Sequence, residues 1–173
     1  AGGCSEDLTA AAVLTEKSAQ RETGLRFYST QAGFVWAAAW GQSQDPAALA
    51  KARHYLERGL VEEANLSQIW ASLALLDWLA DEPELAHNHM QTAMQLSPLA
   101  PSYPLNAAWF MERNGQESQA GVYYLQTLDI APSWASHSFW ETSDLRRAAL
   151  QKWKAANDAA VAPDETVKDA YWI

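Results

Sequence analysis

The sequence has little positive charge, and this shortage narrows the range of partners. Its 12 Lys and Arg stand against 21 Asp and Glu, which gives a net charge of −9. Binding to nucleic acid phosphates or to an anionic membrane surface needs clustered cations, and basic residues cluster only at Arg146-Arg147 and from Lys152 to Lys154. The composition therefore argues against a nucleic acid or an anionic membrane as the partner.

Cysteine and long apolar runs are also scarce. The single cysteine, Cys4, excludes a disulfide within the chain. Gly3-Cys4 resembles the end of a bacterial lipoprotein signal, and a disulfide between chains or a plain buried thiol are the alternatives. No run of 18 or more apolar residues occurs, so we expect no membrane-spanning segment. Because the sequence opens on Ala rather than Met, we expect that something upstream was removed.

Patterns that carry catalysis or bind metals are missing as well. His87 and His89 stand two residues apart, about 200° around a helix, so they cannot hold one ion together. The acidic pairs Glu62-Glu63 and Asp81-Glu82 fall at expected helix ends, where solvation or capping explains them better than acid–base catalysis. The sequence contains no Gly-rich phosphate loop and no HExxH or GxSxG motif. We therefore expect no enzyme activity, no metal site and no cofactor.

What the sequence does contain is a repeat with a period of 34 residues. Ser67 to Pro98 has the pattern of two short amphipathic helices, with a break at Asp81-Glu82-Pro83. Similar residues recur at this spacing on both sides: Ala52, Ala86 and Ala120; Leu56, Met90 and Tyr124; Trp36 and Trp70; Pro98 and Pro132. Since one such pair of helices cannot bury its apolar face alone, we expect neighbouring pairs to pack against it.

The period and the residue types resemble the tetratricopeptide (TPR) family, whose unit is a helix-turn-helix of 34 residues. The best copy places family-typical residues at seven positions of the unit: Trp70, Leu73, Ala74, Ala86, Met90, Ala93 and Pro98. Degenerate copies flank it, the earlier one with Trp40 at a small-residue position and the later one with Pro104 at the Trp position. The resemblance implies an all-α, TPR-like helical-repeat solenoid.

The expected organisation follows from this register. Residues 1–32 form an N-terminal lead and capping helix, residues 33–66, 67–98 and 99–132 form three repeats, and residues 133–157 form a C-terminal cap. Asp45-Pro46, Asn114-Gly115 and Ser143-Asp144 predict a helix start, a left-handed turn and another helix start. Residues 158–173 form a tail that ends on three apolar residues. Such an end either folds back on its own chain or enters another molecule.

Protein binding is the expected activity. In the TPR family the first helix of each repeat lines a concave groove, and we expect the matching positions here to contact a partner: Ala71, Leu75, Trp78, Leu105, Trp109 and Arg113. The resemblance thus implies an apolar groove with Trp78 and Trp109 as anchors and one cation, rather than the carboxylate clamp of some family members. A terminal helix of the same chain filling this groove is the alternative.

Three functions fit these observations. Nine Trp residues suggest exposed aromatic surface, and a tail ending in Tyr171, Trp172 and Ile173 that enters the groove of the next copy would build an oligomer or filament. An adaptor that recruits a different protein is the second function. The texture of the repeats also resembles the extracytoplasmic TPR region of bacterial O-antigen ligase- or polymerase-like proteins, which implies the soluble domain of a larger membrane enzyme. We favour self-association and expect an extracytoplasmic or cell-surface location, with the cytoplasm as the alternative.

Overall fold

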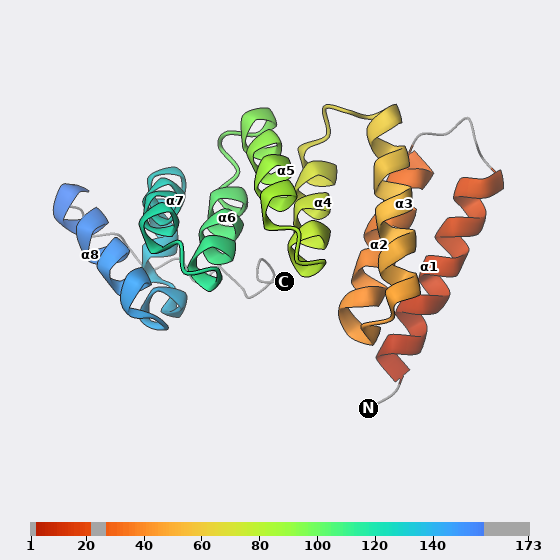
Figure 1. Ribbon diagram of the computed structural model, residues 1–173, viewed down its shortest axis with the longest axis horizontal. Coiled ribbons are helices and arrows are strands. Elements are labelled where there is room, and N and C mark those ends of the chain that lie inside the picture. The colour runs from red at the N-terminus through yellow and green to blue at the C-terminus, as the bar shows by residue number, and fades with distance from the viewer. Residues whose placement is uncertain (1–2, 22–26, 158–173) are drawn as a thin grey trace. The chain divides into compact units, whose positions relative to one another are not determined.

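The computed structural model describes residues 3–21 and 27–157. In this part of the chain the structure has eight α-helices, two short 3-10 helices and no strand (Figure 1). Their bounds are α1 (Gly3–Arg21), α2 (Phe27–Ser43), α3 (Pro46–Glu62), α4 (Ser67–Leu79), α5 (Pro83–Leu96), α6 (Ser102–Arg113), α7 (Glu117–Ile130), η1 (Pro132–Ser136), η2 (Ser138–Glu141) and α8 (Asp144–Asn157). The all-α prediction is therefore confirmed.

Three helical hairpins, α2–α3, α4–α5 and α6–α7, correspond to the three expected repeats. The predicted register is visible in what the repeated positions bury. Ala52, Ala86 and Ala120 are at most 1% exposed, which lets the two helices of each hairpin approach closely. Large residues at a second repeated position are equally buried and fill the space beside them: Leu56, Met90 and Tyr124. The periodicity of the sequence is thus a periodicity of packing.

Two of the hairpin turns share one geometry at the same repeat position. Asp81 and Gly115 both adopt a left-handed backbone, with φ of 61° and 73°. The following N–H groups close the helix ends, because Glu82 donates to the carbonyl of Asp77 at 2.9 Å and Gln116 donates to that of Met111 at 2.8 Å. This is the Schellman motif, in which the last carbonyls of a helix find donors. The left-handed turn predicted at Asn114-Gly115 is confirmed.

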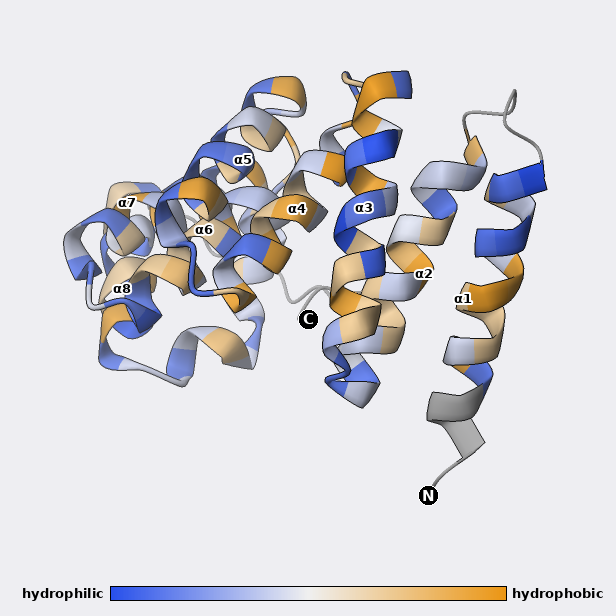
Figure 2. Ribbon diagram, turned by 45° about the vertical axis from the view of Figure 1, so that its right-hand side comes forward, coloured by the Kyte–Doolittle hydropathy of each residue, from blue (hydrophilic) through white to orange (hydrophobic). Residues whose placement is uncertain are grey.

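The chain divides into two compact units, which comprise residues 1–96 and 97–173. In the first unit α1 packs on α2, and the α2–α3 contact is tightened by two glycines. Gly33 faces Leu56, and Gly59 faces Thr30. Figure 2 shows hydrophobic and hydrophilic residues alternating along α3, whose apolar residues include the buried Tyr55 and Leu56. The expected pair of N-terminal helices is present as α1 and α2.

The second unit is built around aromatic side chains. Tyr124 and Trp140 are at most 1% exposed, and their ring centroids lie 5.6 Å apart in an edge-to-face arrangement. The indole N–H of Trp153 on α8 donates to Asp129 Oδ1 on α7 at 2.9 Å. The segment between α7 and α8 is irregular, as two 3-10 helices, where a terminal cap was expected. The limits of the predicted domains stay a prediction.

The expected surplus of exposed Trp is wrong for the described residues. Of the eight Trp residues there, Trp36, Trp140 and Trp153 are buried and the others are half-buried. The hairpins use these large rings as spacers between helices, which absorbs more aromatic surface than composition suggested. Trp172 lies outside the described residues.

Candidate partner-binding surface

Three of the residues predicted to contact a partner form a stripe on α4. Ala71, Leu75 and Trp78 are spaced by four and three residues, so they lie on one face of the helix. All three are half-buried and thus keep part of their surface accessible. The opposite face of α4 carries the buried Ile69, Leu73 and Leu76. We call Ala71, Leu75 and Trp78 the α4 stripe.

The predicted residues of the third repeat behave differently. Leu105 is 0% exposed and belongs to the core of the second unit, so its side chain offers no accessible surface. Trp109 is half-buried and Arg113 is exposed, and the guanidinium carbon of Arg113 lies 5.0 Å from the centroid of the Trp109 ring. This cation–π pair presents an aromatic face with one positive charge. Leu105 is therefore left out of the candidate surface.

The tail residues Tyr171, Trp172 and Ile173 lie outside the described residues, as does the side chain of Cys4. Their predicted roles stay predictions.

A buried carboxylate holds α4 in place beside the stripe. Asp77 is 0% exposed. Its Oδ2 lies 2.6 Å from His89 Nδ1 on α5, and its Oδ1 lies 2.6 Å from Arg53 Nη1 on α3. The Arg53 contact is a close ion pair but not a well-directed hydrogen bond, since Oδ1 lacks a partner by hydrogen-bond geometry. One carboxylate thus connects three helices, and it fixes the helix that carries Trp78.

The sequence analysis did not single out Asp77, although one acidic residue within the apolar run from Ile69 to Leu79 was a signal. Its partner His89 also packs against Trp70, with ring centroids 5.4 Å apart. A His–carboxylate contact serves catalysis when the other ring nitrogen faces a nucleophile. Here the observed contacts tie α5 to α4, which supports the structural role predicted for His89.

A second polar cluster in the second unit centres on Glu112 of α6. Its carboxylate accepts hydrogen bonds from Tyr124 Oη, from Ser143 Oγ at 2.6 Å and from Arg146 Nε at 2.7 Å. Burial raises the pKa of Glu112, but these hydrogen bonds and the charge of Arg146 outweigh it, so the pKa lies below its ordinary value. Burial and the Glu112 hydrogen bond raise the pKa of Tyr124. The cluster joins α6, α7 and α8.

Ser143 has a further role in this cluster. Its Oγ accepts a hydrogen bond from the backbone N–H of Arg146 at 3.2 Å, so it caps the start of α8. The helix start predicted at Ser143-Asp144 is therefore confirmed. Arg146 also stacks its guanidinium over Phe139, 4.1 Å from the ring centroid.

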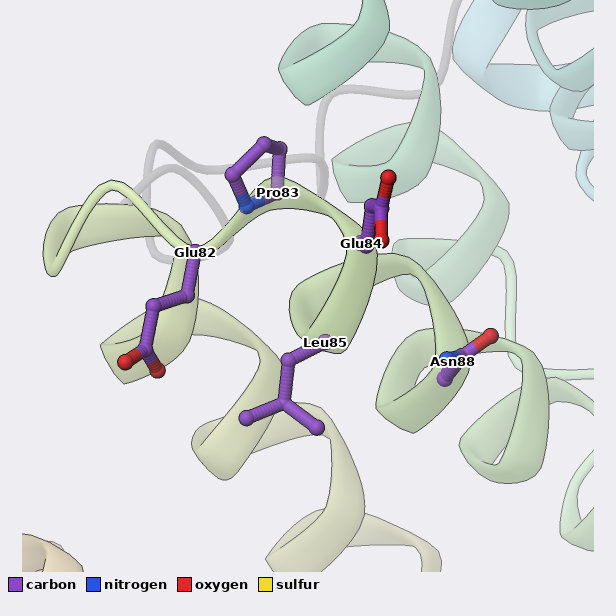
Figure 3. A pocket seen from close by; sticks show the side chains of 5 residues that line it. All are labelled: Glu82, Pro83, Glu84, Leu85 and Asn88. Carbon is purple, nitrogen blue, oxygen red and sulfur yellow. The ribbon is translucent and has the colours of Figure 1, made fainter.

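Two surface hollows remain. One of about 520 Å³ lies at the first turn of α5 and is lined by Glu82, Pro83, Glu84, Leu85 and Asn88. Its side chains point in different directions rather than toward a common point, so they do not form a constellation that could hold a small ligand (Figure 3). The other, of about 240 Å³, lies between α7 and α8 and is mainly apolar.

The described residues contain no group of three or more His, Cys, Asp and Glu side chains that could hold a metal ion. Across the same residues, no helix combines the length and the apolar character needed to cross a membrane.

The chain was compared with known proteins. No family model matches it, and no curated protein matches it. A solved structure described as the crystal structure of MamA is 18% identical and covers 88% of each chain, with a TM-score of 0.66. Another, described as the crystal structure of MamA protein, is 17% identical and covers 91% of this chain and 90% of the other, with a TM-score of 0.63. Neither supports the resemblance to O-antigen ligase-like proteins, and at this identity the likeness shows the fold alone: the predicted TPR-like helical-repeat solenoid is confirmed.

Proposed function

We propose that the chain is a non-catalytic protein-binding and assembly module that associates with further copies of itself. The acceptor is the α4 stripe, and the inserted segment is Tyr171, Trp172 and Ile173 of another copy. The observation that carries the proposal is that an apolar, partly accessible stripe lies on the first helix of the best-formed repeat. A repeat fold with this feature binds extended or helical segments through regularly spaced side chains.

The α4 stripe is suited to binding because it is already ordered. Asp77 links α4 to Arg53 on α3 and His89 on α5, so the helix does not need to be fixed when a partner arrives. Pre-ordering lowers the entropic cost of association. Trp78 is the natural anchor, because Trp residues are enriched among the few positions that dominate binding energy.

A different protein with an apolar segment would fit the same surface, which makes an adaptor the competing function. The chain's mean hydropathy and charge do not separate these two candidates. The difference lies in whether the purified chain binds itself.

The test is light scattering of the purified chain over a range of concentrations, with negative-stain microscopy of the larger species. We expect mass to grow with concentration, and we expect this growth to be lost both in Trp78→Ser and on deletion of residues 168–173. Val61→Ser is the matched control, because Val61 is an apolar residue of the same unit that is 88% exposed and lies outside the stripe. Ala71→Lys blocks the stripe with little change to the core and guards against misfolding of Trp78→Ser.

The outcomes separate the candidates. A chain that stays monomeric at every concentration refutes self-association and leaves the adaptor function. Growth that persists in Trp78→Ser and Ala71→Lys refutes the α4 stripe as the acceptor. Growth that the deletion leaves unchanged refutes the tail as the inserted segment. An extracytoplasmic location stays a prediction from the sequence.

A further inference from the structure

An apolar groove runs between α7 and α8 in the second unit. Its floor and walls come from α7 and α8 together: Gly121, Val122, Leu125, Leu145, Ala148 and Ala149. Glu117, Ser118 and Lys152 complete its lining. Val122 is 63% exposed although it is apolar. We call this hollow of about 240 Å³ the α7–α8 groove.

The groove is open because small residues line it. A Cβ built on Gly121 would meet nothing within 4 Å, and Ala148 and Ala149 contribute only methyl groups. Neighbouring residues of α7 that point into the unit, such as Ala120 and Tyr124, are fully buried. The apolar lining is therefore not needed for the core between α6 and α7, and it suits a segment with bulky side chains.

We propose that residues 158–173 of the same chain bind in the α7–α8 groove. These residues follow α8 directly and include Val161, Val167, Tyr171, Trp172 and Ile173. Leu145 lies 12 residues before Asn157 on α8, a rise of about 18 Å along a helix. An extended chain covers about 3.3 Å per residue, so six residues are enough to return along α8. Direct connection also gives the segment a millimolar effective concentration at the groove.

Charge supports the same occupant. Although the whole chain carries a net charge of −9, α8 carries Arg146, Arg147, Lys152 and Lys154 against Asp144 alone. Lys152 and Lys154 are exposed. The following segment has the opposite balance, with Asp158, Asp164, Glu165 and Asp169 against Lys168. Complementary charges favour this segment over one of random composition and orient it along α8.

The contact does not rest on the proposed function. It gives the tail a site in its own chain, and a tail held there is withdrawn from insertion into another copy. Release of the tail from the α7–α8 groove would then be a step that precedes assembly.

The test is disulfide formation in full-length chains that carry Cys4→Ser. Ser118→Cys places a thiol in the lining of the groove, and Ala170→Cys places one in the tail without removing its aromatic residues. The matched control pairs Ala170→Cys with Ser136→Cys, because both serines are exposed and belong to the second unit, while Ser136 does not line the groove. We expect the disulfide of the Ser118→Cys pair to form within one chain, at least about tenfold faster than in the control, at protein concentrations where chains are monomeric.

Two results overturn the proposal. One is a rate equal to that of the control. The other is a disulfide that joins two chains under the same conditions, which would assign the groove to a second copy. Adding Gly121→Leu, which fills the groove, should slow the intrachain reaction to the control rate, and no slowing also contradicts the proposal. Because the rate is measured on monomers, it is independent of the scattering test for self-association.

Discussion

Gly33→Ala should destabilise the first unit, although replacing Gly by Ala within a helix is ordinarily favourable. A Cβ at residue 33 would lie 2.7 Å from Leu56 Cγ, 2.8 Å from Leu56 Cδ2 and 3.0 Å from the backbone nitrogen of Leu56. Leu56 is 0% exposed, so its side chain has no solvent-filled space to move into. The substitution therefore pushes α2 and α3 apart or forces Leu56 out of its rotamer.

The magnitude follows from two opposing effects. Ala in a helix interior gains about 1 kcal/mol over Gly, whereas overpacking a filled core costs about 1–3 kcal/mol. Because one of the close atoms belongs to the backbone, we take the upper part of that range. The net loss is about 1–2 kcal/mol, which corresponds to a fall in Tm of about 2–8 °C for a chain of this size.

The assay is thermal and urea unfolding followed by circular dichroism. Gly41→Ala is the control in the same helix, and Gly121→Ala is the control in α7, since a Cβ at either position meets nothing within 4 Å. Both controls should be stabilised by up to about 1 kcal/mol. Adding Leu56→Ala to Gly33→Ala should cost less than the sum of the two single changes, because the clash disappears. Gly33→Ala with the stability of Gly41→Ala would refute the reasoning.

The two polar clusters yield further predictions. Asp77→Ala leaves Arg53 and His89 without their shared carboxylate, and we expect a loss of about 2–4 kcal/mol in urea unfolding; a loss as small as that of an exposed acidic residue such as Glu57→Ala would contradict this. The folded-state pKa of Glu112 is lowered, so its contribution is present above the unfolded-state pKa and is lost as pH falls through the folded-state pKa. The urea midpoint of the natural chain should therefore fall more steeply below about pH 5 than that of Glu112→Gln, and parallel curves would show that Glu112 contributes nothing to acid sensitivity.

Local signals in the sequence were sufficient for the helices and the repeat. Asp45 caps α3, since its Oδ1 accepts from the backbone N–H of Ala47 at 3.0 Å, and Pro46 opens the helix. Gly115 and Ser143 mark a turn and a helix start as expected. Capping and turn preferences act over a few residues, and hydrophobic periodicity acts over one helix, so one sequence is enough to place them. The period of 34 residues then extended this local information to the hairpins.

The sequence by itself therefore determined the helices, their pairing and the stripe Ala71, Leu75 and Trp78, because each depends on spacing along one helix or one repeat. Only the tertiary structure decided which of the predicted surface residues are accessible: Leu105 is enclosed by the second unit, while Trp109 keeps an accessible face. It also decided the polar clusters, since Glu112 meets Ser143 and Arg146, 31 and 34 residues further on. Burial and ion pairing depend on neighbours distant in sequence, and their positions are set by how the helices pack rather than by any local pattern.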